Sequence, residues 1–239
     1  MIRDIFCQMS AFGDITSIRP DADTVQSMIT RFSAYGLIPT VFQENNLTLS
    51  PDPSLQKSET LTRLQMVALE KRINVMFASN RIDINRASTG LRSGVSDEDV
   101  NELLDILSAA AMGLSFTRIG LNTTSLLENP TAEMLGKIQP TLTLFDNPDE
   151  LMLRVNQRRN IDFGDNLREN SNVVLILQKT MGQLLINDQP IPIDNSLVVQ
   201  FDINTIPENP ELRFFSEQTK AYMVSAEQLR QSLLSDLDS

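Results

Sequence analysis

The amino-acid sequence predicts an α+β protein with a mostly antiparallel sheet, two amphipathic helices in its N-terminal half and one C-terminal helix. Three stretches repeat apolar residues at the i, i+3, i+4 spacing of a helix. Many short segments instead alternate apolar and polar residues between turn dipeptides, which is typical of an antiparallel meander. Helices and strands do not alternate one by one, so a parallel βαβ fold is not expected.

The first predicted helix lies after Pro20, between two strands. Asp21 or Asp23 can cap its start, and Gly36 stands where a left-handed residue ends a helix. Its apolar face consists of Val25, Met28, Ile29, Phe32 and Tyr35. We expect the flanking strands at 2–9 and 37–44, and Pro39 indicates that the second is an edge strand.

A loop, three strands and the second helix follow. Residues 45–58 are rich in Asn, Ser and Pro and predict a loop. Alternation predicts strands at 61–69, 73–77 and 82–84, with a tight turn at Ser79-Asn80. Ser96 and Asp99 resemble a capping box that starts a helix over the next apolar stripe, Val100, Leu103, Leu104, Leu107 and Ala111. Gly113 ends this helix.

The second half is richer in strands and ends in the third helix. We expect strands at 114–123, 142–145, 150–158, 173–179, 183–186, 190–193 and 197–203, and a short helix at Asn129-Pro130. Ser225 and Gln228 predict the start of the C-terminal helix. We divide the chain into an α+β half, 1–125, and a strand-rich half with this helix, 140–239, with one continuous domain as the alternative.

The composition limits the chemistry that the chain can perform. The 239 residues contain no histidine and one cysteine, so Ser-His-Asp triads, Cys-His pairs and the usual zinc sites are excluded. No nucleotide-binding glycine motif occurs. We therefore expect no cofactor, and binding is favoured over catalysis.

The charge and the N-terminus indicate the surroundings and the partners. A net charge of −11 repels phosphate backbones and anionic membranes, so direct binding of nucleic acid is not expected. No segment has the roughly 20 apolar residues that cross a membrane. The N-terminus lacks a signal-peptide pattern and Cys7 has no partner for a disulfide, which predicts a cytoplasmic protein. We interpret Cys7 as a small buried apolar residue.

Two carboxylates, Asp83 and Asp202, are candidate metal ligands because each follows apolar residues at a strand end. The structural alternative is an outward-facing residue of an alternating strand. Their surroundings also resemble each other: Arg81-Ile82-Asp83-Ile84-Asn85 is similar to Gln200-Phe201-Asp202-Ile203-Asn204, 119 residues later. We interpret this similarity as chance, with a duplicated fold as the alternative.

Two further features suggest a protein partner. Leu229, Leu233 and Leu237 form an apolar stripe on the C-terminal helix, which can pack on its own domain, on a second copy or on another protein. Arg154, Arg158 and Arg159 form the densest basic patch. We interpret this patch as a hairpin turn balanced by Asp162, Asp165 and Glu169, with an anion or an acidic partner helix as the alternative ligand.

The order of segments resembles a sporadically distributed family of uncharacterised bacterial proteins. The similarity rests on Arg118-Ile119-Gly120-Leu121, which resembles the family's central strand, and on Val198-Val199-Gln200-Phe201-Asp202-Ile203, which resembles its late strand. The long helical tail expected after the late strand is missing from this chain. The resemblance implies a bacterial origin and a role linked to accessory gene clusters, and no catalytic residues.

These observations favour a non-enzymatic interaction protein, an accessory or regulatory subunit of a bacterial system that binds a protein partner or itself. One alternative is an enzyme that uses carboxylates and Mg²⁺, with Asp83 or Asp202 as ligands. Another is an acidic mimic of nucleic acid, such as a phage inhibitor, that binds a basic protein.

Overall fold

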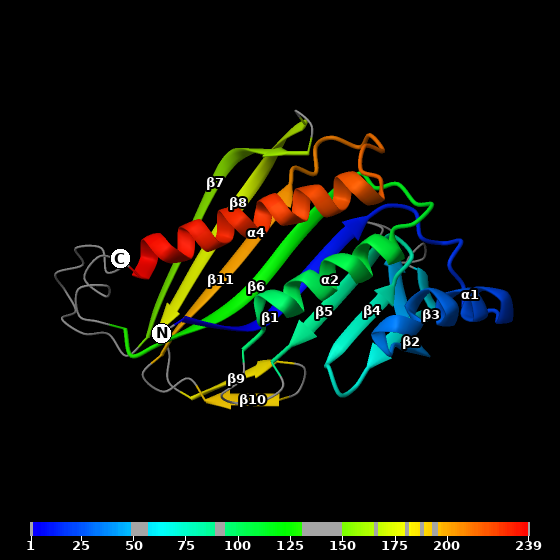
Figure 1. Cartoon of the computed structure of the whole chain (residues 1–239), viewed down its shortest axis with the longest axis horizontal. Helices are drawn as coiled ribbons and strands as arrows, with labels where there is room; N and C mark the ends of the chain where they lie inside the picture. Colours follow the sequence, from blue (N-terminus) through cyan, green and yellow to red (C-terminus); the bar gives the residue numbers. More distant parts are fainter. Residues whose placement is uncertain are drawn as a thin grey trace.

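The computed structural model describes residues 2–48, 57–88, 94–130, 150–164, 167–179, 182–186, 189–192 and 196–238 (Figure 1). It confirms an α+β fold with a mostly antiparallel sheet, in which the described residues form three α-helices. The strand predicted at 142–145 and most of the short helix predicted from Asn129-Pro130 lie outside the described residues.

One nine-stranded sheet runs through both halves of the chain, in the order β2-β3-β4-β5-β1-β6-β11-β8-β7. All of its described pairings are antiparallel. The strands are β1 (Ile2–Phe12), β2 (Ile38–Thr48), β3 (Lys57–Ala68), β4 (Ile73–Phe77), β5 (Arg81–Ala87), β6 (Arg118–Glu128), β7 (Leu151–Phe163), β8 (Leu167–Lys179) and β11 (Ser196–Thr205). A separate hairpin joins β9 (Gln183–Ile186) and β10 (Gln189–Pro192).

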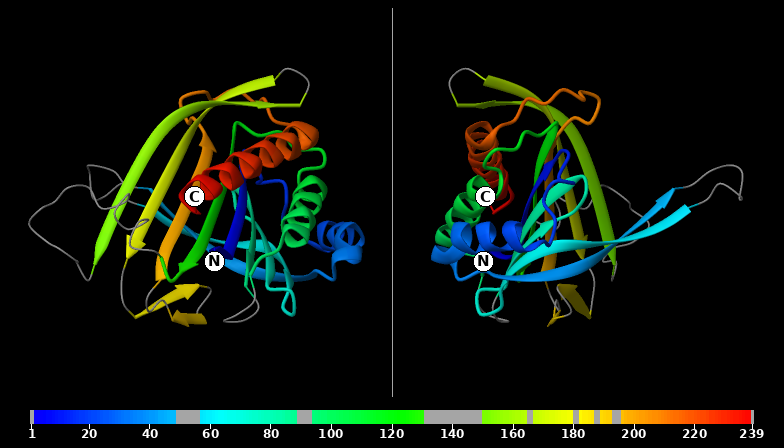
Figure 2. Two further views of the ribbon diagram at one scale, coloured as in Figure 1. Left: turned by 60° about the vertical axis from the view of Figure 1, so that its left-hand side comes forward. Right: turned by 90° about the vertical axis from the view of Figure 1, so that its right-hand side faces the viewer.

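All three helices cover the same face of the sheet (Figure 2). They are α1 (Ala22–Phe32), which continues into a short 3₁₀ turn (Ser33–Tyr35), α2 (Asp97–Ala110) and α4 (Ser216–Asp238). Alternate side chains of the strands point towards these helices and form one core with them. In β1 these are Cys7, Met9 and Ala11. The other face of the sheet carries no helix of the described part.

The local signals that begin and end two helices are confirmed. Asp21 accepts a hydrogen bond from the Thr24 amide at the start of α1, and Gly36 is left-handed with φ of 70°. Ser96 and Asp99 form the reciprocal bonds of a capping box at the start of α2. Each of these signals depends only on neighbours in sequence.

The start predicted for the C-terminal helix is wrong. Helix α4 begins at Ser216, and Ser225 lies within it. The first turns are stabilised by tertiary contacts: Tyr222 is fully buried and packs edge-on against Phe163 at 5.5 Å between ring centroids. Its hydroxyl lies 2.8 Å from Ser171 Oγ. This packing extends the helix past the capping pattern that the sequence contains.

The predicted hairpin turn at Arg154, Arg158 and Arg159 is also wrong, because all three lie within strand β7. The chain turns only after Gly164, which has a positive φ of 54°. The loop predicted at 45–58 is too long at both ends, since β2 extends to Thr48 and β3 begins at Lys57. The polar residues at both ends of this segment belong to the paired strands β2 and β3 and not to a loop.

The two halves have a related order of elements. Strand β1 is followed by α1, the strands β2, β3, β4 and β5, and then α2. Strand β6 is followed by β7, β8, the hairpin β9–β10, β11 and then α4. Strands β1 and β6 pair at the centre, flanked by β5 and β11. Asp83 is paired with Ser10 of β1, and Asp202 with Asn122 of β6, so the two similar segments occupy equivalent strands. Whether the similarity arose by chance or by duplication stays a prediction.

Candidate binding face

The face of the sheet without helices carries a continuous field of polar side chains. Residues in β5, β1, β6 and β11 that alternate with the core residues point to this face, which we call the open face. Its side chains are mainly amides, hydroxyls, arginines and aspartates. The field ends towards Leu126 and Val198, which are apolar and buried.

One row of this field crosses five neighbouring strands and consists almost entirely of amides. The strand register places Asn74, Asn85, Gln8, Asn122 and Asp202 side by side. In the described part of the structure, the amides of Gln8 and Asn122 form no side-chain hydrogen bond, and Asn85 Oδ1 is buried without a donor. These groups retain donors and acceptors for a ligand, because folding does not use them.

A second row places two arginines on either side of Phe12. Arg81 of β5 and Arg118 of β6 are both paired in register with Phe12 of β1. Their guanidinium carbons lie 5.9 Å and 4.8 Å from the centroid of the Phe12 ring, within the range of a cation–π contact. The ring therefore holds two positive charges at one end of the open face, where β1 ends and β5 and β6 begin.

Hydrogen bonds fix the orientation of both arginines. Arg81 Nε lies 2.7 Å from Asp83 Oδ2, and the Ser10 hydroxyl donates to Asp83 Oδ1 at 2.6 Å. On the other side, Arg118 Nη2 donates to Asn204 Oδ1 at 3.1 Å, and Asn204 Nδ2 donates to Asp202 Oδ1 at 2.8 Å. Asp83 and Asn204 are both buried, so these supporting contacts are shielded from water.

Gly120 makes the second set of contacts possible. It is paired with Asn204 across β6 and β11. A Cβ atom at Gly120 would lie 2.9 Å from the Cβ of Asn204, which is closer than side chains tolerate. The glycine thus leaves space for Asn204 to lie between Arg118 and Asp202.

Positive and negative charges are separated between the two layers. The three helices contain ten acidic and three basic residues, which accounts for most of the net charge of −11. On the open face of the six strands from β5 to β7, arginines outnumber acidic residues by six to four. The open face is therefore the less acidic layer of an acidic protein.

The two predicted metal ligands do not come together. Asp83 and Asp202 lie on strands three positions apart in the sheet, which separates them by about 14 Å at ordinary strand spacing. Each is already held, Asp83 by Arg81 and Ser10, and Asp202 by Asn204. In the described ranges, no group of three or more His, Cys, Asp or Glu side chains is placed to hold a metal ion.

The leucine stripe of the C-terminal helix faces its own domain. Leu229, Leu233 and Leu237 are half-buried and pack against the core, and the neighbouring Leu234 is buried. Helix α4 lies across β6 and β7 and beside α2. Contact of these leucines with a partner stays a prediction.

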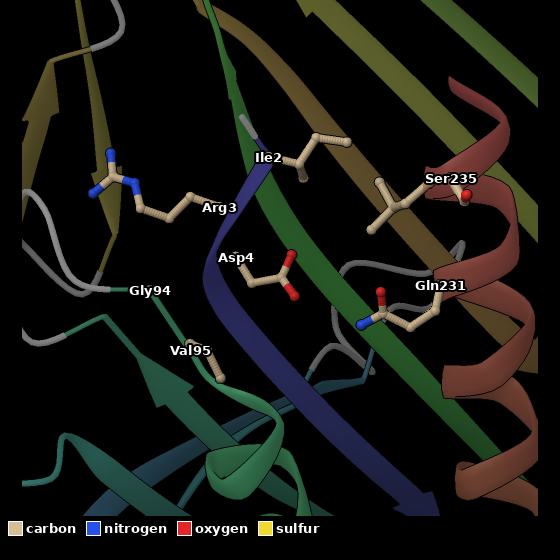
Figure 3. A pocket seen from close by; sticks show the side chains of 8 residues that line it. Ile2, Arg3, Asp4, Gly94, Val95, Gln231 and Ser235 are labelled. Carbon is tan, nitrogen blue, oxygen red and sulfur yellow. The ribbon is translucent and has the colours of Figure 1, made fainter. Parts of the chain in front are cut away.

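A polar hollow of about 380 Å³ lies between the start of β1, the segment before α2 and the end of α4 (Figure 3). Ile2 and Asp4 point towards α4, while Arg3 points away from it. The Asp4 carboxylate is used internally: Arg230 donates to both of its oxygens at 3.0 and 2.8 Å, and Ser125 donates to Oδ1 at 2.5 Å. This hollow borders a structural joint between β1 and α4.

Cys7 is buried beneath this joint, as expected of a small apolar residue. Burial, and secondarily the nearby Glu227, raises the pKa of the thiol. A thiol that stays protonated is a poor nucleophile. The structure therefore gives Cys7 a packing role.

Sequence reasoning did not find Phe12, Arg118 or Asn204. Two signals pointed to them. A glycine within the strand at Gly120 indicates a close approach of another chain segment, and polar residues recur on one side of β1 and β11. Their proximity depends on pairing between strands more than 80 residues apart, which alternation alone does not reveal.

Comparison with protein-family models, with curated proteins and with solved structures gives no match for this chain. The resemblance to the bacterial family thus stays a prediction. Among the described residues, no helix is both long enough and apolar enough to cross a membrane.

Proposed function

We propose that this protein is a non-enzymatic binding protein that docks another protein on the open face, as an accessory or regulatory subunit of a bacterial system. The observation that carries the proposal is the polar field itself, in which Gln8 and Asn122 keep unused amides on the same face as the arginines that flank Phe12. Oriented donors and acceptors on a rigid sheet suit a partner that brings its own hydrogen-bonding groups.

The alternative functions receive less support. A carboxylate enzyme would rest on Asp83 and Asp202, which are far apart and already engaged. A mimic of nucleic acid needs free acidic groups, and α2 contains five acids and no base. Three of those five are paired: Asp99 and Glu102 with Arg86, and Asp105 with Lys220. These ion pairs reduce the field that such a mimic would need.

A capture experiment with two matched variants tests the proposal. Asn122→Glu places a longer, negatively charged side chain on the open face, and Gln228→Glu makes the same change at an exposed site of α4. Tagged wild-type chain and both variants are incubated with extract of the source organism, and bound proteins are quantified by mass spectrometry. We expect one protein to be recovered equally with wild type and Gln228→Glu, and about tenfold less with Asn122→Glu. Equal recovery with both variants would contradict the proposal.

A further inference from the structure

We infer that the partner presents a carboxylate, from an acidic protein segment, to the two arginines that flank Phe12. This inference rests on the proposed function and specifies the chemistry of the partner. It begins from the register, which brings Arg81, Phe12 and Arg118 into one row across β5, β1 and β6.

The two arginines differ in how far their charges are compensated. Arg81 forms an ion pair with Asp83, although its side chain remains 47% exposed. Arg118 has no carboxylate partner among the described residues, and its Nη2 donates to the neutral amide of Asn204. Its Nε is buried without an acceptor. Within the described ranges, the row therefore holds one arginine without an ion-pair partner at a fixed position, linked to the Asp202 carboxylate only through Asn204.

This arrangement is pre-organised for an anion. The Phe12 ring and the Asn204 amide hold Arg118 in one orientation, so little side-chain freedom remains to be lost on binding. Bonds between guanidinium and carboxylate are stronger than bonds between neutral groups. Removal of a fixed positive charge from water without a partner is unfavourable, and a carboxylate would supply that partner.

Charge also selects the class of partner. Nucleic acid carries many phosphates and requires many cations, whereas this site offers two arginines, one of them already paired with Asp83, within a chain of net charge −11. Farther along the same face, Gln8 and Asn122 present neutral groups that suit the amides of a polypeptide. An acidic segment of protein satisfies both features.

Fluorescence anisotropy with labelled hexaglutamate tests the site directly. We expect saturable, salt-sensitive binding to the wild-type chain, weakened about tenfold by Arg118→Gln. Arg19→Gln removes the same charge from an exposed arginine outside the open face, whose Nε donates to the Thr16 carbonyl, and should leave binding unchanged. Equal weakening by both variants, or stronger competition by inorganic phosphate than by acetate at equal ionic strength, would overturn the inference.

The same variants separate this inference from the proposed function. In the capture experiment, loss of the partner with both Asn122→Glu and Arg118→Gln supports the proposed function and the carboxylate inference. Loss with Asn122→Glu alone overturns the carboxylate inference and leaves the proposed function standing. Retention of the partner with both variants overturns the proposed function and the inference. Circular dichroism and thermal melts of Arg118→Gln verify that the fold is retained in every comparison.

Discussion

At the scale of single residues, the most constrained group is the fully buried Arg230 of α4. Its Nε donates to Glu227 Oε2 at 2.8 Å, and its two terminal nitrogens bind both oxygens of Asp4. Burial opposes the charged form, but the bond to Glu227 and the attraction of both carboxylates outweigh it and raise the pKa of Arg230. One cation thus joins the first strand to the last helix.

Loss of Arg230 should destabilise the protein strongly. Arg230→Met leaves two largely buried carboxylates without a partner, which should lower the free energy of unfolding by about 3–5 kcal/mol. Arg168→Ala, which breaks an exposed pair with Asp162, should cost far less, because water screens that pair. Urea unfolding measures both values. Similar losses of unfolding free energy in the two variants would show that the buried cluster contributes no more to stability than an exposed ion pair.

Cys7 gives a prediction about pH. Its pKa is raised in the folded state from an ordinary value of 9.0, so the folded state holds its proton more tightly than the unfolded state. The thiol's contribution to stability is therefore complete below about pH 9 and is lost as the pH rises above it. Cys7→Ala should show a shallower decline of stability between pH 9 and 10.5 than wild type. Parallel declines, measured by chemical unfolding, would contradict the raised pKa.

At the scale of elements, local capping patterns are reliable only where packing does not override them. The capping box of Ser96 and Asp99 begins α2 as expected. The similar pattern at Ser225 does not begin α4, because Phe214 and Tyr222, which precede Ser225, pack together with Phe163 at 5.5–6.2 Å between ring centroids. The residues around Ser225 give no information about Phe163, because it comes from β7 and lies more than 50 positions earlier in the sequence.

Two alanine substitutions test this difference between the helices. Ser96→Ala removes an acceptor for the Asp99 amide and should cost about 1 kcal/mol. Ser225→Ala, within α4, should leave the stability unchanged or raise it slightly, because alanine is the better residue inside a helix. Thermal unfolding of both variants provides the comparison. A loss with Ser225→Ala equal to that with Ser96→Ala would indicate that the helix truly begins there.

At the scale of the whole molecule, the sequence predicts the class of fold and most strands, but not their order. Periodicity identified β4 at 73–77 and β9 at 183–186 with their observed bounds. The central pairing of β1 with β6 joins residues more than 100 positions apart, such as Met9 and Leu121. Strand pattern does not specify partners at that distance. The candidate face depends on this pairing, so it was not predictable.

The candidate face lies on the middle strands of the sheet. The equivalent strands β5 and β11 flank the β1–β6 pair, and each contributes a supporting aspartate, Asp83 or Asp202. Two similar polar segments thus lie on the same face. In the sequence these aspartates stand as isolated carboxylates. In the folded protein Asp83 positions Arg81 and Asp202 positions Asn204.

Site-specific photo-crosslinking in living cells tests the central claim most directly. A benzoylphenylalanine replaces either Asn122 on the open face or Gln228 on the helical layer, both of which are exposed. If the open face is the docking surface, Asn122 should crosslink to one protein in good yield, and Gln228 should not. Crosslinks to that protein from Gln228 alone would contradict the claim that the open face receives the partner.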